Sequence, residues 1–238
     1  MPVRSLWRLC AVTLCLFLAA ALWDATALDL PLARLAGDGT GFAWRSDPVV
    51  VRWLHEAPRH LSTLCVLALI VGVWRPWGFL RRMARADRLQ LVGSILAAMG
   101  AVIVAKRLSA TSCPWDLAEF GGMARYVSHW SWGTYDGGPG HCFPGGHASA
   151  AFAYLAGWFV VRRTQPELSG YWLAWALAAG LVLGVAQQVR GAHYMSHTFW
   201  SAWICWTMGL AVEAAVATWR RARAGGGTLL RDTKLNEA

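Results

Sequence analysis

Long apolar segments alternate with short arginine-rich segments along most of this chain. Windows long enough to cross roughly 30 Å of hydrocarbon predict helices at about 6–23, 61–77, 89–108, 147–163, 171–189 and 196–218. A backbone in lipid must satisfy its own hydrogen bonds, so uncharged runs of this length indicate helices rather than strands. The pattern predicts an all-α fold: a single six-helix transmembrane bundle over residues 1–223, followed by a flexible cytoplasmic tail at 224–238.

Composition and charge support this class. Of the 238 residues, 56% are hydrophobic and only 15% are charged, as expected for a chain that lies mostly in lipid. The formal net charge of +9 comes mainly from arginines beside the apolar segments, where attraction to anionic lipid headgroups accounts for it. The sequence therefore predicts the lipid bilayer as a partner and no nucleic acid.

The arginine clusters also predict the orientation of the chain, since short cytoplasmic segments carry an excess of Lys and Arg. They flank alternate ends of the apolar segments and comprise Arg4, Arg8, Arg75, Arg81, Arg82, Arg85, Arg88, Arg162, Arg163, Arg220, Arg221 and Arg223. Both termini are therefore predicted to be cytoplasmic. The connections at 24–60, 109–146 and 187–195 are predicted to be extracytoplasmic.

The first apolar segment has a second interpretation. Arg4, Arg8, the apolar run and the small residues Ala25-Thr26-Ala27 together imitate a secretory signal with a cleavage site. We favour a retained helix. Cleavage would still leave the new terminus on the extracytoplasmic side, so the later loops keep the same placement under either interpretation.

One candidate anion site lies where the second extracytoplasmic connection enters the fourth helix. The segment Phe143-Pro144-Gly145-Gly146-His147 leads directly into that helix. A Gly-Gly turn at a helix start offers backbone amides to an anion, and the helix dipole favours negative charge there. Taken alone, the segment is also explained by a flexible loop end followed by an interfacial histidine.

Two further segments carry charges and imidazoles at the same membrane depth. His193 and His197 are four residues apart and would share one face of a helix. Lys106 and Arg190 stand at the same predicted level, and a basic pocket there needs an anionic partner such as a phosphate. Taken alone, each of these two cations is also explained by a long side chain that extends, or snorkels, to the membrane–water interface. The agreement of three segments favours a common site.

The six cysteines fall into two groups. Those within the apolar segments are interpreted as small buried residues; they are Cys10, Cys15, Cys65 and Cys205. Cys113 and Cys142 both lie in the 109–146 connection, on the side predicted to be oxidising. A disulfide between them would close the loop beside the site, and free thiols are the alternative, because sequence alone does not give the distance between their Cα atoms.

These segments resemble, in order and spacing, the three motifs of the type 2 phosphatidic acid phosphatases, a family related to the vanadium haloperoxidases. The family's first motif is Lys, six residues, Arg-Pro, and here it reads Lys106 followed by Cys113-Pro114. The second, Pro-Ser-Gly-His, reads Pro144-Gly145-Gly146-His147. The third is Ser-Arg, five residues, His, three residues, Asp. It reads Ala186-Gln187, then His193 and His197.

The resemblance implies roles for the residues that match. His193 would be the nucleophile that forms a phosphohistidine, and His147 would protonate the leaving oxygen and then activate water. Lys106 and the amides around Gly145 and Gly146 would hold the phosphoryl oxygens. The family needs no metal, so no cofactor is expected.

Four side chains of the family pattern are replaced, by Cys113, Gly145, Gln187 and His197. Without an arginine at position 187, we infer that Arg190 takes its place, since it precedes His193 by about one helical turn. Arg107 and Arg125 are the alternatives for the other missing cation. A neutral His197 would accept the hydrogen bond that the family's aspartate accepts, so activity is expected to fall below about pH 6 as this imidazole becomes protonated.

The sequence therefore predicts a multi-pass lipid phosphatase of the bacterial inner membrane that hydrolyses a lipid phosphomonoester or diphosphate at the periplasmic face. Candidate substrates are phosphatidic acid, phosphatidylglycerol phosphate, undecaprenyl diphosphate and the phosphates of lipid A. The alternatives are a lipid phosphotransferase, a family member that binds lipid phosphate without turnover, and a metal-binding membrane protein with His141, His147, His193 and His197 as zinc ligands. Nothing in the sequence indicates an oligomeric state.

Overall fold

The computed structural model describes residues 3–131 and 133–236. All of the predicted segments are helical: α1 (Val3–Ala25), α4 (Ala57–Trp74), α5 (Arg85–Leu108), α6 (Gly146–Thr164), α7 (Pro166–Val189) and α8 (Met195–Asn236). Strands within the described residues are confined to the two-residue β1 (Gly37–Asp38) and β2 (Gly41–Phe42), which pair antiparallel. The all-α prediction is confirmed.

Five helical stretches are long and apolar enough to cross a membrane: Leu6–Ala25, Pro48–Arg82, Arg85–Leu108, Pro166–Val189 and Met195–Arg223. The remaining predicted span, 147–163, is α6, and most of its side chains are buried. It packs against α5, α7 and α8 rather than lipid, so it tolerates Gly, His, Ala and Ser in its first turns. The count of exactly six spans stays a prediction.

Small residues let the helices approach α6 closely. A Cβ atom on Gly180 of α7 would lie 2.2 Å from the ring of Phe152, and one on Gly209 of α8 would lie 2.5 Å from the Cα atom of Ala156. Close backbone approach through small residues is typical of helix packing in membranes, where dispersion replaces the hydrophobic effect. These contacts place α6 at the centre of the bundle.

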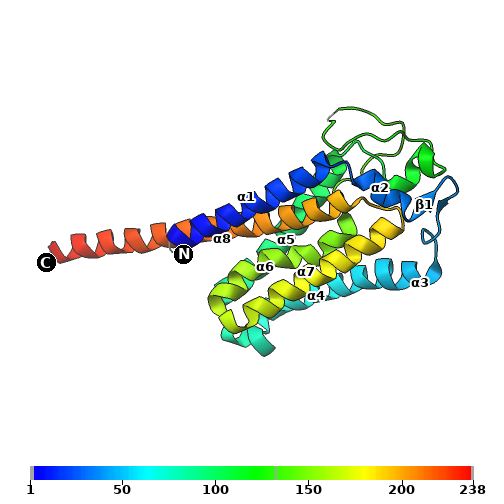
Figure 1. Ribbon diagram of the computed structural model, residues 1–238. Helices are drawn as coiled ribbons and strands as arrows, with labels where there is room; N and C mark the ends of the chain where they lie inside the picture. The colour runs from blue at the N-terminus through cyan, green and yellow to red at the C-terminus, as the bar shows by residue number, and fades with distance from the viewer. Residues whose placement is uncertain (1–2, 132, 237–238) are drawn as a thin grey trace.

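The ends of the bundle differ in character. Figure 1 shows the start of α1 and the distal part of α8 at one end, while α2 (Asp29–Arg34), the hairpin and the 109–145 loops gather at the other. At the first end, Asp87 accepts from Arg163 at 2.9 Å and from Arg220 at 2.7 Å, which clamps α5, α6 and α8 together. The predicted tail, 224–238, lies outside the part of the chain whose side chains the structure describes.

The structure contradicts one prediction, which concerns the 24–60 segment. The sequence assigned it to a loop, but helical structure begins at Pro48 with α3 (Pro48–Val51) and continues through the π-helical turn η1 (Arg52–Glu56) into α4. Asp47 caps this start by accepting from the amides of Val49 and Val50, each at 2.9 Å. Pro58, which removes one helical hydrogen bond, lies in the first turn of α4, shortly after the π-helical turn.

Two aspartates join the first turns of α8 to neighbouring elements, Asp24 from α1 and Asp29 from α2. Asp24, in the last turn of α1, accepts from the indoles of Trp130 and Trp200, each at 2.8 Å. Asp29 accepts from the Ser196 amide at 3.0 Å and from its hydroxyl, which caps the start of α8. The start of α8, where His197 lies, is thereby fixed.

Candidate active site

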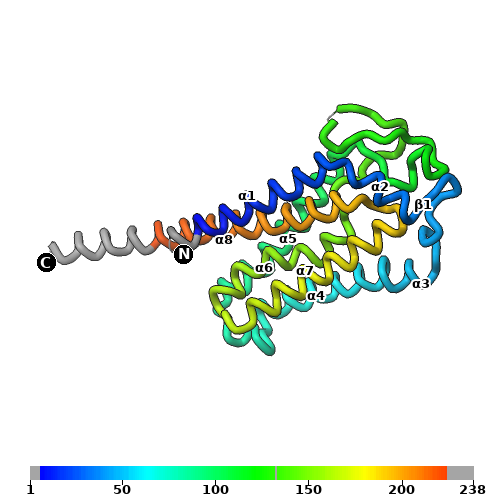
Figure 2. The backbone as a smooth tube through the Cα atoms, in the orientation of Figure 1, coloured from blue at the N-terminus to red at the C-terminus, as the bar shows by residue number. Residues whose placement is uncertain are grey.

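The three predicted segments meet at one end of the bundle. Lys106 lies in the last turn of α5, His147 in the first turn of α6, and His193 in the connection between α7 and α8. Figure 2 shows that these helix ends lie beside one another, away from the chain termini. Lys106 and His147 are near enough for their charges to act on His193. The site residues assigned from distant parts of the sequence are therefore neighbours.

His193 and His197 are in contact. Their Nδ1 atoms lie 3.4 Å apart, and the two residues are only 4% and 1% exposed. His197 occupies the position of the family's aspartate, and its Nδ1 atom lies where an acceptor for His193 is needed. When His193 donates from Nδ1, its second nitrogen, Nε2, keeps its lone pair.

Burial lowers the pKa of His193 well below its usual value, and the charges of Lys106 and His147 lower it further. The imidazole is therefore neutral at physiological pH. A nucleophilic nitrogen needs an unprotonated lone pair, and a neutral His193 has one.

The start of α6 offers fewer free amides than the sequence suggested. The Gly145 amide donates to the carbonyl oxygen of His197 at 3.2 Å, and the Ser201 hydroxyl donates to the Gly145 carbonyl at 2.9 Å. Gly145 thus joins α6 to α8 and has no amide left for a phosphoryl oxygen. The amides of Gly146 and His147, in the first helical turn, have no partner within the helix and remain candidates.

Lys106 has the environment of an anion-binding cation. It is half-buried, and a Cβ atom on Gly146 would lie 3.8 Å from its Cδ atom, so its stem runs beside the start of α6. None of the described carboxylates forms an ion pair with it. A half-buried ammonium group without a carboxylate is suited to a phosphate.

Arg190 is buried, with 5% of its surface exposed. Its Nη1 atom donates to Gln187 Oε1 at 2.9 Å, and its Nη2 atom donates to the Arg45 carbonyl at 2.9 Å. Its Nε atom is buried without a partner among the described residues, and burial lowers the pKa of the guanidinium. Gln187 stands where the family has arginine, and it orients the arginine found three residues later.

His55 is a neighbour of the site that sequence reasoning missed. Its ring stacks on His147 with centroids 3.9 Å apart and an interplanar angle of 30°, and its Nδ1 atom lies 3.0 Å from Nη1 of Arg190. Position 55 belongs to no family motif, and it falls in the segment expected to be a loop. The capping residue Asp47 was the available signal that a helix begins before it.

Cys113 and Cys142 are joined in a disulfide, with Cα atoms 5.1 Å apart. The Cys142 sulfur lies 3.5 Å from Nδ1 of His193 and 3.2 Å from the Ala192 carbonyl oxygen. A disulfide sulfur carries no proton, so these are packing contacts. The bond thus takes the place of the family's motif arginine at position 113 and braces the segment that carries His193.

Other candidates lie away from this cluster. Arg107 and Arg125 are exposed, and Arg125 donates to the Tyr135 carbonyl oxygen at 3.2 Å. His141 is also exposed. Among the described residues, the ligand atoms near enough to share a metal ion belong to Cys113, Cys142 and His193, two of which are bonded to each other. The four imidazoles of the metal-binding alternative do not form such a group.

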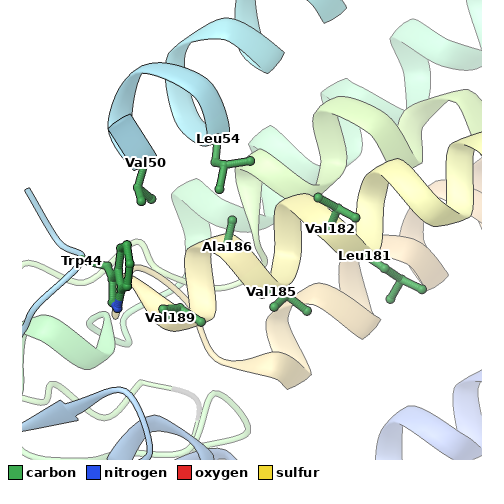
Figure 3. Close-up of a pocket in the computed structure, with 8 residues that line it drawn as sticks. All are labelled: Trp44, Val50, Leu54, Leu181, Val182, Val185, Ala186 and Val189. Atoms are coloured by element: carbon green, nitrogen blue, oxygen red, sulfur yellow. The ribbon is translucent and has the colours of Figure 1, made fainter. Parts of the chain in front are cut away.

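An apolar groove of about 510 Å³ lies between the 44–54 segment and α7. Figure 3 shows Val50 and Leu54 on one wall and residues of α7 on the other, with Trp44 beside Val189 at one end. Two of the lining residues, Leu54 and Val189, are the immediate sequence neighbours of His55 and Arg190.

Comparison with known proteins agrees with these motifs. A model of the PAP2 superfamily matches residues 87–221, which include Lys106, His147 and His193. No curated protein sequence matches the chain. Its fold is similar to the crystal structure of a transmembrane PAP2 type phosphatidylglycerolphosphate phosphatase from Bacillus subtilis, with 14% identity and a TM-score of 0.51 over 90% of this chain and 96% of that one. The matched region spans more than half of the sequence and confirms the resemblance: the chain belongs to the PAP2 superfamily.

Proposed function

We propose that this protein is a membrane lipid phosphatase that acts through a phosphohistidine on His193. The observation that carries the proposal is the pairing of a buried, neutral His193 with His197 at 3.4 Å, beside a lysine that forms no ion pair with a carboxylate of the described residues. Such a pair supplies a nucleophile, and the lysine supplies a cation for the phosphoryl group.

In the first step, Nε2 of His193 forms a bond to phosphorus and the bond from phosphorus to the lipid oxygen breaks. His147 gives its proton to the leaving oxygen, so the lipid departs as an alcohol, or as a lipid monophosphate if the substrate is a diphosphate. Lys106, the amides of Gly146 and His147, and Arg190 bind the phosphoryl oxygens as charge develops on them.

In the second step, water attacks the phosphorus of the phosphohistidine. His147, now neutral, takes a proton from that water, the bond from nitrogen to phosphorus breaks, and inorganic phosphate leaves. His197 accepts the hydrogen bond from Nδ1 of His193 while the His193 ring carries positive charge. The cycle returns both imidazoles to their starting protonation states, and it requires no metal.

The apolar groove supports a lipid substrate. A headgroup bound at Arg190 leaves its hydrocarbon free to enter the groove lined by Val50, Leu54 and Val185. The Bacillus subtilis protein is described as a phosphatidylglycerolphosphate phosphatase, so phosphatidylglycerol phosphate heads the list of candidates. Phosphatidic acid, undecaprenyl diphosphate and lipid A phosphates are the others.

The arginine clusters support a periplasmic active site in a bacterial inner membrane. Residues Arg162 and Arg163 end α6, and Arg220 lies on the distal part of α8, all at the end opposite His193. Because basic residues favour the cytoplasmic side, the end that carries His193 would face the periplasm.

The proposal is tested by phosphate release from this panel of lipid phosphates by the purified protein in detergent micelles. We expect release by the wild type and loss of release in His147→Ala and His193→Ala. Radiolabel from the phosphoryl group should be trapped on the wild type and not on His193→Ala. Equal trapping on both would contradict the phosphohistidine, and a lipid acceptor that gains the label would indicate a phosphotransferase.

A further inference from the structure

His55 lies outside all three family motifs, yet it contacts two residues of the site. It belongs to the π-helical turn η1, which joins α3 to α4. A single π-helical turn has less favourable hydrogen-bond geometry than an α-helical turn, and such turns occur frequently at functional sites. The turn here brings an imidazole against the ring of His147, with centroids 3.9 Å apart.

The bond to Arg190 determines the protonation state of His55. A guanidinium only donates hydrogen bonds, so Nδ1 of His55, 3.0 Å from Nη1 of Arg190, must be the acceptor. The proton of the neutral ring is therefore on Nε2. A second proton on Nδ1 would face the arginine cation directly, and the two groups would repel each other.

The π-helical turn is also held to the end of α7. Gln187 Nε2 donates to the Leu54 carbonyl at 3.2 Å, and Arg190 Nη2 donates to the Arg45 carbonyl at 2.9 Å. The position of His55 is thus determined by the same two residues, Gln187 and Arg190, that stand in for the family's arginine.

We propose that His55 is a positioning residue for the phosphatase reaction: its neutral ring, fixed by Arg190, holds the imidazole of His147 in the orientation needed for proton transfer. This inference rests on the proposed function, in which His147 is the acid and base. A neutral ring stacked on His147 tolerates the positive charge that His147 carries as an acid, whereas a second imidazolium in that position would oppose it. The buried Nε of Arg190, which has no partner among the described residues, is left to bind a phosphoryl oxygen.

The test compares His55→Ala and His55→Phe with His60→Ala, a control at an exposed histidine of α4. Loss of the stacked ring should lower kcat on the order of 10- to 100-fold, the size of effect that small misplacement of a catalytic group produces. KM should change less than kcat. His55→Phe restores the stacked ring without the acceptor for Arg190, so it should recover part of kcat while KM for the lipid phosphate rises. His60→Ala should match the wild type.

The pH profile separates this role from a merely structural one. The basic limb of the kcat profile reports the group that must be protonated in the enzyme–substrate complex, here His147. We expect the limb to move in His55→Ala and to stay in place in His60→Ala. The charged or titratable groups that face His55 are Arg190, His147, Glu56 and Arg59, and both variants retain all four. An unchanged kcat and an unchanged limb in His55→Ala would overturn the proposal.

Orthovanadate, a mimic of the phosphoryl group in transfer, gives a readout that does not depend on turnover. We expect vanadate to raise the Tm of the wild type, and His55→Ala to need at least several-fold more vanadate for the same shift. If the wild type hydrolyses no lipid phosphate but this difference appears, the proposed activity fails and the positioning role fails with it, and His55 only supports binding of an anion. If the wild type hydrolyses lipid phosphate and His55→Ala equals it in both assays, the positioning role of His55 is contradicted and the proposed phosphatase activity is supported. If vanadate changes no Tm and no phosphate is released, both are overturned.

Discussion

Nδ1 of His193 lies 3.4 Å from Nδ1 of His197, and the backbone of Cys142 is a hydrogen-bond partner of both imidazoles. If His193 donates, its Nε2 atom keeps the lone pair that attacks phosphorus. If His197 donates, Nε2 of His193 carries the proton and cannot attack. An aspartate in place of His197 would accept only, and so would select the productive form. With an imidazole at position 197, both forms of His193 are populated, so only part of the protein has the productive form.

We therefore predict that His197→Asp raises kcat, whereas His197→Ala lowers it. The aspartate both fixes the productive form of His193 and stabilises the positive charge that the ring carries in the phosphohistidine. Removing the acceptor costs a hydrogen bond to a charged ring, worth about 1.5–3 kcal/mol, which corresponds to roughly 10- to 100-fold in rate. Steady-state kinetics on one lipid phosphate measures both changes.

Folding must be checked in the same variants, because His197 is buried and a carboxylate there has to be desolvated. Equal Tm values for His197→Asp and the wild type would show that the carboxylate is accommodated. A kcat in His197→Ala equal to that of the wild type would contradict the role assigned to His197.

Burial of His193 also makes stability depend on pH. The unfolded chain protonates this imidazole at about pH 6.5, but the folded protein resists protonation because burial and the charge of Lys106 lower its pKa. The contribution to the free energy of unfolding is therefore complete above pH 6.5 and declines as pH falls below it, by at most about 1.4 kcal/mol per unit for one group. We expect the Tm to fall less between pH 7 and pH 5 in His193→Gln than in the wild type. If the Tm of both proteins falls equally between pH 7 and pH 5, His193 has the same pKa in the folded and unfolded states.

Arg190 is expected to bind the phosphoryl group, so Arg190→Lys should raise KM about 10-fold or more. The guanidinium reaches Gln187 and Arg45 through two different nitrogens, and the single nitrogen of a lysine cannot reproduce that fork and also reach the substrate. Arg107→Ala is the matched control, because Arg107 is exposed on α5. Michaelis–Menten kinetics on both variants tests this. A rise in KM for Arg107→Ala without one for Arg190→Lys would exchange their roles.

The sequence was sufficient to place the chemistry that depends on local spacing. Their spacing brings His193 and His197 into contact, but α8 begins only at Met195, so the shared helical face that we expected is not the reason for the contact. Arg190 contacts Gln187, three residues earlier, as expected for residues about one helical turn apart. Hydrophobic length alone located the helices, since the bilayer sets a minimum length for each.

Tertiary contacts were not accessible in the same way. The ring of His55 reaches that of His147 because a capped helix begins at Pro48 and passes the end of α7. Positions 55 and 147 are 92 residues apart, and no local sequence pattern predicts a contact over that separation. The Gly145 amide looked available because a Gly-Gly turn opens a helix, but the His197 carbonyl of a neighbouring helix accepts from it. Packing between helices decides which of the locally suitable groups face a ligand.

The disulfide should stabilise the site. Closing a loop of 29 residues is worth about 3–4 kcal/mol in the chain-entropy account. We expect Cys113→Ser with Cys142→Ser to lower the Tm, and reductant to do the same for the wild type while leaving the double variant unchanged. Thermal unfolding with and without reductant measures this. If reductant lowers the Tm of the double variant by the same amount, the effect of reductant comes from residues other than Cys113 and Cys142.

The groove between the 44–54 segment and α7 predicts selectivity for long hydrocarbon chains. Val185 lines it from α7 and is exposed, so Val185→Trp would occupy the space that a lipid tail needs. Loss of contact with about two methylene groups, at roughly 0.8 kcal/mol each, should lower kcat/KM about 10-fold for a long-chain lipid phosphate. A short-chain, water-soluble phosphate that does not reach the groove should react as before.

A second groove provides the matched control for this substitution. Leu177 lies on the same helix and lines an apolar groove of about 530 Å³ that α7 forms with α1, α6 and α8 and that meets the first groove at Leu181. Leu177→Trp should leave kcat/KM unchanged for both substrates. If the two tryptophans impair the long-chain substrate equally, the groove lined by Val185 has no special part in binding the tail. If Val185→Trp impairs the short-chain substrate as well, the substitution has disturbed the neighbouring Gln187 and Arg190 rather than the path of the hydrocarbon.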